Sequence, residues 1–137
     1  MQASNIFDKI EPVKCVLCGK NLINDIGLSM VQIRTDDSGK ITKVIPCCKG
    51  ECDRKLKSDM DNNEHDGWKD LSEFTNPFLF MKHIMSVINS MYDKEGFANK
   101  EAFETYKELV LNCYPYVTRN LTDTEAQTAK YDAMLPF

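Results

Sequence analysis

The segment 12–56 contains two cysteine-rich stretches, Cys15-Val16-Leu17-Cys18-Gly19 and Pro46-Cys47-Cys48-Lys49-Gly50-Glu51-Cys52. Two pairs of cysteines on either side of a hairpin supply the four sulfur ligands of a tetrahedral metal site. Zinc (Zn²⁺) is the expected metal, because soft thiolates at about 2.3 Å suit its preference for closed tetrahedral coordination. The sequence therefore predicts a zinc site in the first third of the chain.

Three of these cysteines compete for two ligand positions. Neighbouring side chains of an extended segment point to opposite faces, so Cys47 and Cys48 should not both reach one metal ion. Cys48 lies closer to the start of the expected helix, whose first turn holds Cys52. We therefore predict Cys15, Cys18, Cys48 and Cys52 as the metal ligands, with Cys47 as the alternative to Cys48.

The composition is that of an ordinary globular protein. Hydrophobic residues make up 42% of the 137-residue chain and charged residues 28%, both usual values. No apolar run reaches the ~18 residues that span a membrane, and the N-terminus lacks the basic and hydrophobic parts of a signal peptide. We therefore expect an intracellular, cytoplasmic protein, in which spaced cysteines bind metals more often than they form disulfides.

The segment around the cysteines predicts a hairpin followed by a helix. Strand-forming residues dominate 28–34 and 41–47, and the intervening 35–40 contains turn formers and a glycine. A helix that begins near 49–51 should end before the polar run 61–67, which is typical of a connecting segment.

The second half of the chain predicts helices over 77–93, 100–114 and about 122–134. The dipeptide Asn76-Pro77 is a helix-start signal, and Pro115 should end the second helix. The first of these helices is apolar on nearly all sides, which predicts a central helix contacted by several neighbours.

These elements define an α+β fold. A zinc-binding hairpin-and-helix module over 1–60 is followed by a linker over 61–75 and by a mainly helical part over 76–137. We expect about three helices in that last part and expect them to pack on the zinc module.

Roughly residues 12–60 resemble the treble-clef group of zinc fingers: a knuckle (Cys15, Cys18), a β-hairpin, and a helix whose first turn completes the site (Cys48, Cys52). The chain departs from the commonest pattern in having three residues between the second pair and in its doubled cysteine. The resemblance implies a structural metal. It implies little about function, because this finger serves nucleic-acid-binding, protein-binding and nuclease proteins alike.

The distribution of charge along the chain and the lack of suitable catalytic residues favour a non-catalytic protein with a protein partner. Residues 1–58 carry ten Lys and Arg against seven Asp and Glu, and residues 59–137 carry seven against fourteen, a balance that disfavours tight nucleic-acid binding. Four thiolates leave no open coordination position, and of the two histidines only His65 could replace a cysteine ligand, if the first helix is short. We therefore expect a non-catalytic protein-interaction or regulatory protein, adaptor-like or inhibitor-like, with no membrane partner.

The alternative function is a sequence-specific nucleic-acid-binding regulator that uses the hairpin and the first helix. Its candidate contact face consists of the basic residues of segment 34–57: Arg34, Lys40, Lys43, Lys49, Arg54, Lys55 and Lys57. No aromatic residue interleaves them, so single-stranded bases lack their usual stacking platform. Compensation of the negative charge on a four-thiolate cluster by Lys14, Lys20, Lys49 and Arg54 explains much of the basic excess in this half equally well.

Overall fold

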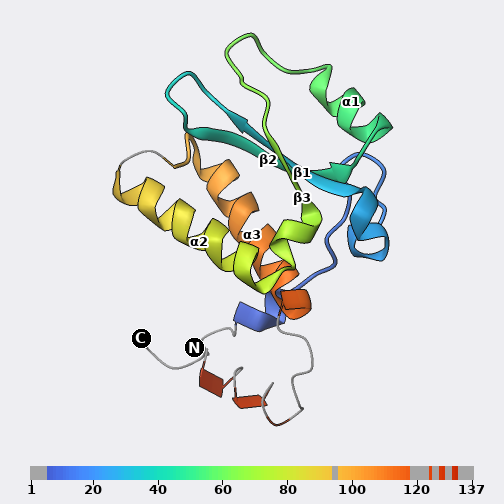
Figure 1. The fold of residues 1–137 in the computed structure, drawn as a ribbon, viewed down its shortest axis with the longest axis vertical. Helices are drawn as coiled ribbons and strands as arrows, with labels where there is room; N and C mark the ends of the chain where they lie inside the picture. Colours follow the sequence, from blue (N-terminus) through green and yellow to red (C-terminus); the bar gives the residue numbers. More distant parts are fainter. Residues whose placement is uncertain (1–5, 94–95, 118–123, 125–126, 129–130, 133–137) are drawn as a thin grey trace.

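A three-stranded antiparallel sheet lies at the centre of the computed structural model, which describes residues 6–93, 96–117, 124, 127–128 and 131–132 (Figure 1). The α-helices are α1 (Glu51–Lys57), α2 (Pro77–Tyr92) and α3 (Lys100–Val117), the strands are β1 (Ser29–Thr35), β2 (Ile41–Cys48) and β3 (Trp68–Asp70), and the 3-10 helices are η1 (Ile6–Lys9), η2 (Leu22–Leu28) and η3 (Leu71–Phe74). The predicted α+β class is confirmed.

The predicted hairpin forms the core of the sheet. Strands β1 and β2 pair antiparallel from Ser29 opposite Cys48 to Thr35 opposite Ile41. Their loop is closed by Asp36, whose carboxylate accepts hydrogen bonds from two backbone N–H groups of the turn. Strand β1 is central, with β2 on one side and β3 on the other.

The segment 61–75, predicted to be a linker, instead completes the sheet and the core. Strand β3 pairs with β1, and the Leu71 and Phe74 side chains of η3 are fully buried. Just before β3, a Cβ atom on Gly67 would lie 2.8 Å from the Ile33 carbonyl oxygen, so the two backbones meet as closely as glycine allows. One hydrophobic cluster extends from Val13 to Cys113 and crosses the predicted division.

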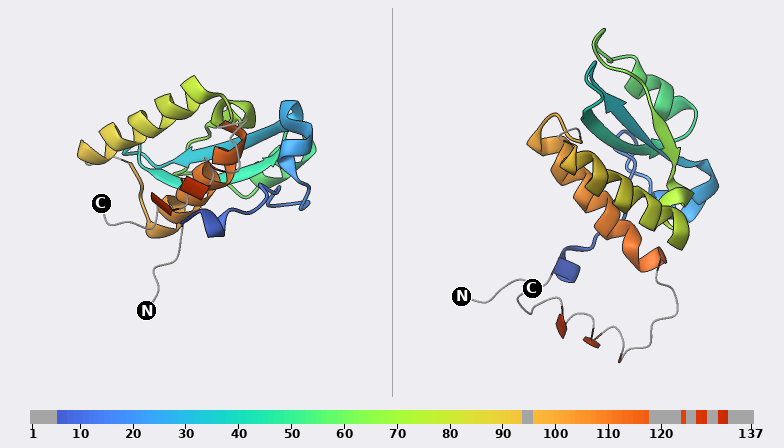
Figure 2. Two further views of the ribbon diagram at one scale, coloured as in Figure 1. Left: turned by 90° about the horizontal axis from the view of Figure 1, so that it is seen from below. Right: turned by 60° about the vertical axis from the view of Figure 1, so that its left-hand side comes forward.

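The helices lie on opposite sides of the sheet (Figure 2). Helix α1 contacts the face that carries Gln32 and Arg34, and α3 packs against β2 on the other side. Helix α2 lies beside α3, and among the described elements it contacts η3 most extensively.

Helix α2 begins where the sequence predicts. The Asn76 carboxamide oxygen accepts hydrogen bonds from the N–H groups of Phe78 and Leu79, and Pro77 occupies the first helical position. Such a cap satisfies donors that have no partner within the helix. The helix ends at Tyr92, and Gly96 beyond it adopts the left-handed conformation with a φ of 83°.

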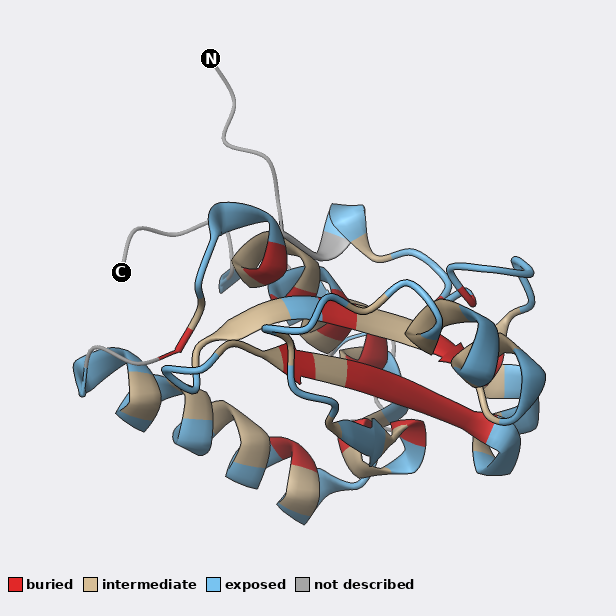
Figure 3. Ribbon diagram, turned by 90° about the horizontal axis from the view of Figure 1, so that it is seen from above, coloured by how far each residue is buried: buried red, intermediate tan, exposed pale blue. Residues whose placement is uncertain are grey.

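The expectation that α2 is a central helix is wrong. Only Phe80 of this helix is buried, because η3 and α3 cover one side and leave the rest of the apolar surface open. Figure 3 colours much of the outer side of this helix as exposed. Five exposed apolar residues lie in a row there and are here called the α2 face: Phe78, Met81, Met85, Ile88 and Tyr92. Met91 is also exposed, beside this row.

Helix α3 begins at a side-chain cap and extends beyond the predicted end at residue 114. The Asn99 side chain accepts a hydrogen bond from Ala102 N–H and donates one to the Thr42 carbonyl of β2. The helix continues through Pro115 to Val117, contrary to the predicted end, although proline has no N–H to donate to the carbonyl four residues earlier. No helix within the described ranges has the length and apolar character needed to cross a membrane.

The predicted final helix over 122–134 lies largely outside the described residues, including its capping residues Thr122 and Glu125. The short stretches described there, around Thr124, Thr128 and Tyr131, have helical backbone, and the Thr128 hydroxyl donates a hydrogen bond to the Thr124 carbonyl.

Within the described residues, neither edge of the sheet offers a long free strand to which another strand could add. Along β2, Ile41 N–H donates to the Gly96 carbonyl at 2.6 Å, Ala98 N–H donates to the Ile41 carbonyl at 2.8 Å, and Val16 N–H donates to the Pro46 carbonyl at 3.0 Å. The opposite edge, β3, contains three residues, two of which are charged.

We expect Leu71→Ala to destabilise the whole protein rather than one part of it. Removal of a fully buried leucine side chain leaves a cavity and costs about 2–5 kcal/mol. Denaturant unfolding followed separately by tryptophan fluorescence and by helical circular dichroism should show both signals shifting together. Ser72→Ala, an exposed neighbour, is the matched control. Separate transitions for the two probes would show that 61–75 joins two independent units.

Candidate functional site

Four of the six cysteines form a cluster at one end of the sheet. The Sγ atoms of Cys15, Cys18, Cys48 and Cys52 all lie within 4.8 Å of one another, and the Cys18–Cys48 separation is 3.7 Å. Sulfur ligands at about 2.3 Å from a tetrahedral metal ion are about 3.8 Å apart. All six cysteines are free thiols. The cluster can therefore hold a metal ion, in an arrangement consistent with a zinc-finger-like site.

The first pair is held by a tight knuckle. Cys15 N–H donates to the Lys20 carbonyl, and Gly19 N–H donates to the Cys15 carbonyl, each at 2.9 Å. The turn requires a left-handed residue, and Gly19 supplies it with a φ of 78°. Cys18 N–H points at the Cys15 sulfur at 3.4 Å, so the backbone supports negative charge on that atom.

The second pair lies where β2 passes into α1. Cys48 is the last residue of β2, and Cys52 is in the first turn of α1. Gly50, in the left-handed region at a φ of 86°, makes the sharp change of direction between them. Cys47 is fully buried in the hydrophobic cluster, so the structure brings Cys48 rather than Cys47 to the other three sulfurs.

Buried polar side chains hold α1, and with it Cys52, against the sheet. Helix α1 has no buried residue of its own. The Arg34 guanidinium donates to the Leu56 carbonyl at 2.7 Å and to the Gln32 side-chain oxygen at 3.0 Å. Gln32 in turn donates to the Asp53 carboxylate at 2.8 Å. The bonds to Leu56 and Asp53 are partly buried, so each fixes the helix more strongly than a fully exposed bond would.

The acidities of the cluster thiols differ. Burial alone would raise the pKa of Cys15, but N–H groups of Cys18, Cys48 and Leu17 donate to its sulfur and lower the pKa to about 6. Burial, together with hydrogen bonds to the neighbouring cysteines, raises the pKa of Cys48 to about 12 and also raises the pKa of Cys52. Near neutral pH the metal-free cluster therefore holds its first negative charge on Cys15.

The other two cysteines are buried thiols away from the cluster. Burial raises the pKa of Cys47 and that of Cys113 to about 12 in each case. A protonated thiol in apolar surroundings behaves as a small hydrophobic side chain rather than as a metal ligand. Cys113 packs in the core on α3.

The basic residues of the alternative function do not form one open face. Arg34 is only 2% exposed and serves α1, so it cannot contact a nucleic acid. Arg54 is exposed on α1, and Lys40 lies in the β1–β2 loop. The remaining four are paired with acids: Lys43 with Glu64, Lys49 with Asp70, Lys55 with Glu51, and Lys57 with Asp53 and Asp66.

Neither of the two histidines, both within the described residues, belongs to the cluster. His65 is exposed and its ring nitrogen lies 2.8 Å from the Asp37 carboxylate. The His83 ring stacks on Phe74 with centroids 4.8 Å apart, and burial lowers its pKa. The structure therefore does not bring His65 into the place of Cys52.

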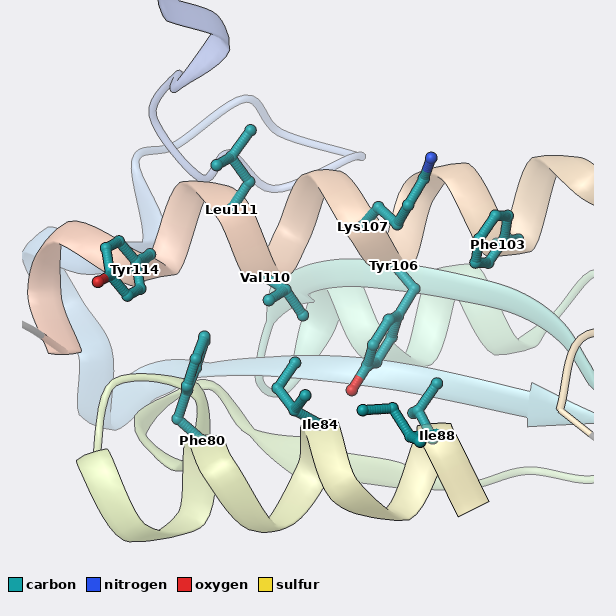
Figure 4. Close-up of a pocket in the computed structure, with 10 residues that line it drawn as sticks. Phe80, Ile84, Ile88, Phe103, Tyr106, Lys107, Val110, Leu111 and Tyr114 are labelled. Carbon is teal, nitrogen blue, oxygen red and sulfur yellow. The ribbon is translucent and has the colours of Figure 1, made fainter. Parts of the chain in front are cut away.

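A second feature, not anticipated from the sequence, is an apolar groove between α2 and α3 (Figure 4). Its volume is about 410 Å³, and Phe80, Ile84 and Ile88 of α2 face Phe103 and Val110 of α3 across it. The sequence showed these residues as apolar, but apolar character alone did not distinguish a groove from a packed core.

We expect Cys52→Ser to lose the bound metal and most of the folded structure. A structural zinc ion contributes on the order of 10 kcal/mol, and a whole domain is stable by only ~5–15 kcal/mol. Because Cys15 lies in the shared hydrophobic cluster, unfolding should extend beyond residue 60. Elemental analysis of protein purified under reducing conditions measures the metal content. Cys113→Ser is the control, and metal loss from it would contradict the ligand assignment.

Metal loading should release protons, and acid should release the metal. The pKa values of Cys48 and Cys52 are raised, so at pH 7 both thiols carry protons that a metal ion must displace. Falling pH favours those protons, and affinity for the metal therefore decreases. Calorimetric titration in two buffers of different ionisation enthalpy measures the proton count. A count of zero at pH 7 would contradict the raised pKa values.

Comparison with known proteins provides no family for this chain: no family model, curated protein or solved structure matches it. The likeness to zinc fingers therefore rests on the four clustered cysteines and on the elements that carry them.

Proposed function

We propose that this chain is a small, non-catalytic protein-interaction or regulatory protein whose fold is stabilised by zinc. The observation that carries the proposal is the α2 face, a row of large apolar side chains that the described part of the chain leaves uncovered. Patches of this kind on a folded protein mark surfaces that bind another macromolecule. The acidic balance of residues 59–137 favours a protein as that partner.

Zinc is the metal that the donor set favours. Four sulfur donors at nearly tetrahedral spacing suit zinc better than metals that prefer oxygen or nitrogen ligands. The order of the elements supports a treble-clef-like finger, since a knuckle, a hairpin and a helix carry the ligands in turn. All six cysteines are free, in keeping with a reducing compartment such as the cytoplasm.

A structural role for the metal follows from its ligands. A catalytic zinc ion keeps one coordination position for water or substrate. Four thiolates fill the tetrahedral shell, and both histidines make contacts elsewhere. The metal then acts by joining the knuckle to α1, as in other closed thiolate sites.

The nucleic-acid alternative has weaker support. Its largest potential base-reading group, Arg34, is buried, and Lys55 and Lys57 on α1 are each paired with acids. A surface whose cations are already neutralised releases few counterions on binding phosphate and gains little affinity from them.

Affinity capture with paired variants tests the proposal. Tagged wild-type chain and tagged Met81→Glu should be exposed to the same native extract, with Ser86→Glu on the polar side of α2 as the control. We expect specific partner proteins to be recovered by the wild type and the control and to be lost by at least about tenfold with Met81→Glu, because a charge at an apolar contact is costly.

The opposing result would come from nucleic acid. Retention of duplex or single-stranded oligonucleotides that weakens with salt, and that is abolished by Lys55→Glu with Lys57→Glu, would favour the alternative function. Equal protein recovery by Met81→Glu and the wild type would remove the α2 face from the proposal.

A further inference from the structure

We propose that the α2 face pairs with the same face of a second copy of this chain, so that two copies form an antiparallel, two-fold symmetric dimer. The inference rests on the proposed function, because it names the partner that covers the same surface. Its support is the area of the face, its lack of charge and the symmetry of its residues.

The exposed apolar area exceeds what a monomer ordinarily leaves open. Phe78 is 85% exposed and Tyr92 is 88% exposed, and the other three members are about half exposed. At about 200 Å² for a fully exposed residue of this size, the face presents roughly 650 Å². The largest apolar patch on a typical monomer is about 300–600 Å², and a stable interface takes about 800 Å² from each partner.

The groove between α2 and α3 extends this surface. Ile88 belongs to both, so the α2 face is continuous with the groove (Figure 4). The face and the groove together thus approach the area that a stable dimer requires.

The spacing of the face suits a neighbouring helix. Its members are separated alternately by three and four residues, from Phe78 to Met81, Met85, Ile88 and Tyr92. An average spacing of 3.5 residues keeps apolar side chains along one seam against a partner helix. The face carries no charged residue, and within α2 the only basic side chains are Lys82 and His83. Lys82 borders the face, four residues after Phe78 and three before Met85, so the five apolar residues themselves bring no like charges together.

The face is also nearly symmetric about its central residue. Met85 has an aromatic residue seven positions away on each side, Phe78 before it and Tyr92 after it. In an antiparallel pair with Met85 on the two-fold axis, Phe78 of one copy meets Tyr92 of the other. Aromatic pairs of this kind add about 0.5–1.5 kcal/mol beyond the area they bury, and a self-complementary patch is what a two-fold interface requires.

Light scattering with size-exclusion chromatography over a range of micromolar concentrations tests the dimer on the full, metal-loaded chain. The wild type should have the mass of two copies. Met85→Glu and Met85→Lys should each weaken dimerisation by at least about tenfold, because each places two like charges together on the two-fold axis. Ser86→Glu, on the polar side of α2, should dimerise like the wild type, and circular dichroism verifies that all variants fold.

An equimolar mixture of Met85→Glu and Met85→Lys gives the most specific result. Opposite charges then meet at the axis, and the mixture should regain the mass of two copies. A mixture that stays monomeric, or a wild type that stays monomeric throughout, overturns the proposal. A monomeric wild type that still captures other proteins through the α2 face overturns the dimer alone, whereas a monomer that captures none also overturns the proposed function.

Discussion

The convergence of four sulfur atoms from two distant segments is the constraint on which the rest of this fold depends. Cys15 and Cys18 come from a knuckle near the N-terminus, and Cys48 and Cys52 come from the junction of β2 and α1, yet all four Sγ atoms lie within 4.8 Å of one another. This meeting requires the knuckle to lie against the end of β2, where Val16 N–H donates to the Pro46 carbonyl. It also requires α1, a helix with no buried residue, to begin immediately after the hairpin. Short helices of this kind are not stable alone, so the cluster and the polar contacts of α1 hold it together.

The buried polar network links this end of the molecule to its centre. Arg34 and Gln32 belong to the central strand, and their side chains contact the Leu56 carbonyl and Asp53 of α1. On the other side of the same strand, the hydrophobic cluster continues to η3 and α3. A buried arginine is tolerated only when its donors are satisfied, and here the accepting carbonyl is supplied by the helix that carries Cys52. The cysteine cluster and the helical half therefore belong to one structural unit.

Local patterns in the sequence predicted the parts of the structure that depend on few neighbours. The cysteine spacing, the turn between β1 and β2, and the capping residue Asn76 each specify a short stretch of backbone, and each is present. Strand β3 was not predicted, because its three residues include two charged ones and show no apolar alternation. The start of η3 does have a local signal, since Asp70 and Glu73 form a capping box. The burial of Arg34 was not predictable, because charged residues are rarely buried and its acceptors come from other segments. The exposure of α2 could not be predicted from the sequence either. The spacing of its apolar residues identifies an apolar surface but does not tell which segment or partner packs against it.

The protected edges of the sheet limit the ways in which this protein can assemble. Strand addition needs a free row of backbone donors and acceptors, but segments of the same chain occupy positions along β2, and β3 offers only a short charged edge. End-to-end growth into a cross-β ribbon is therefore disfavoured even at high concentration. In the dimer that we propose, assembly uses side chains on the helical layer instead, and a two-fold symmetric contact covers the exposed apolar surface and stops at two copies.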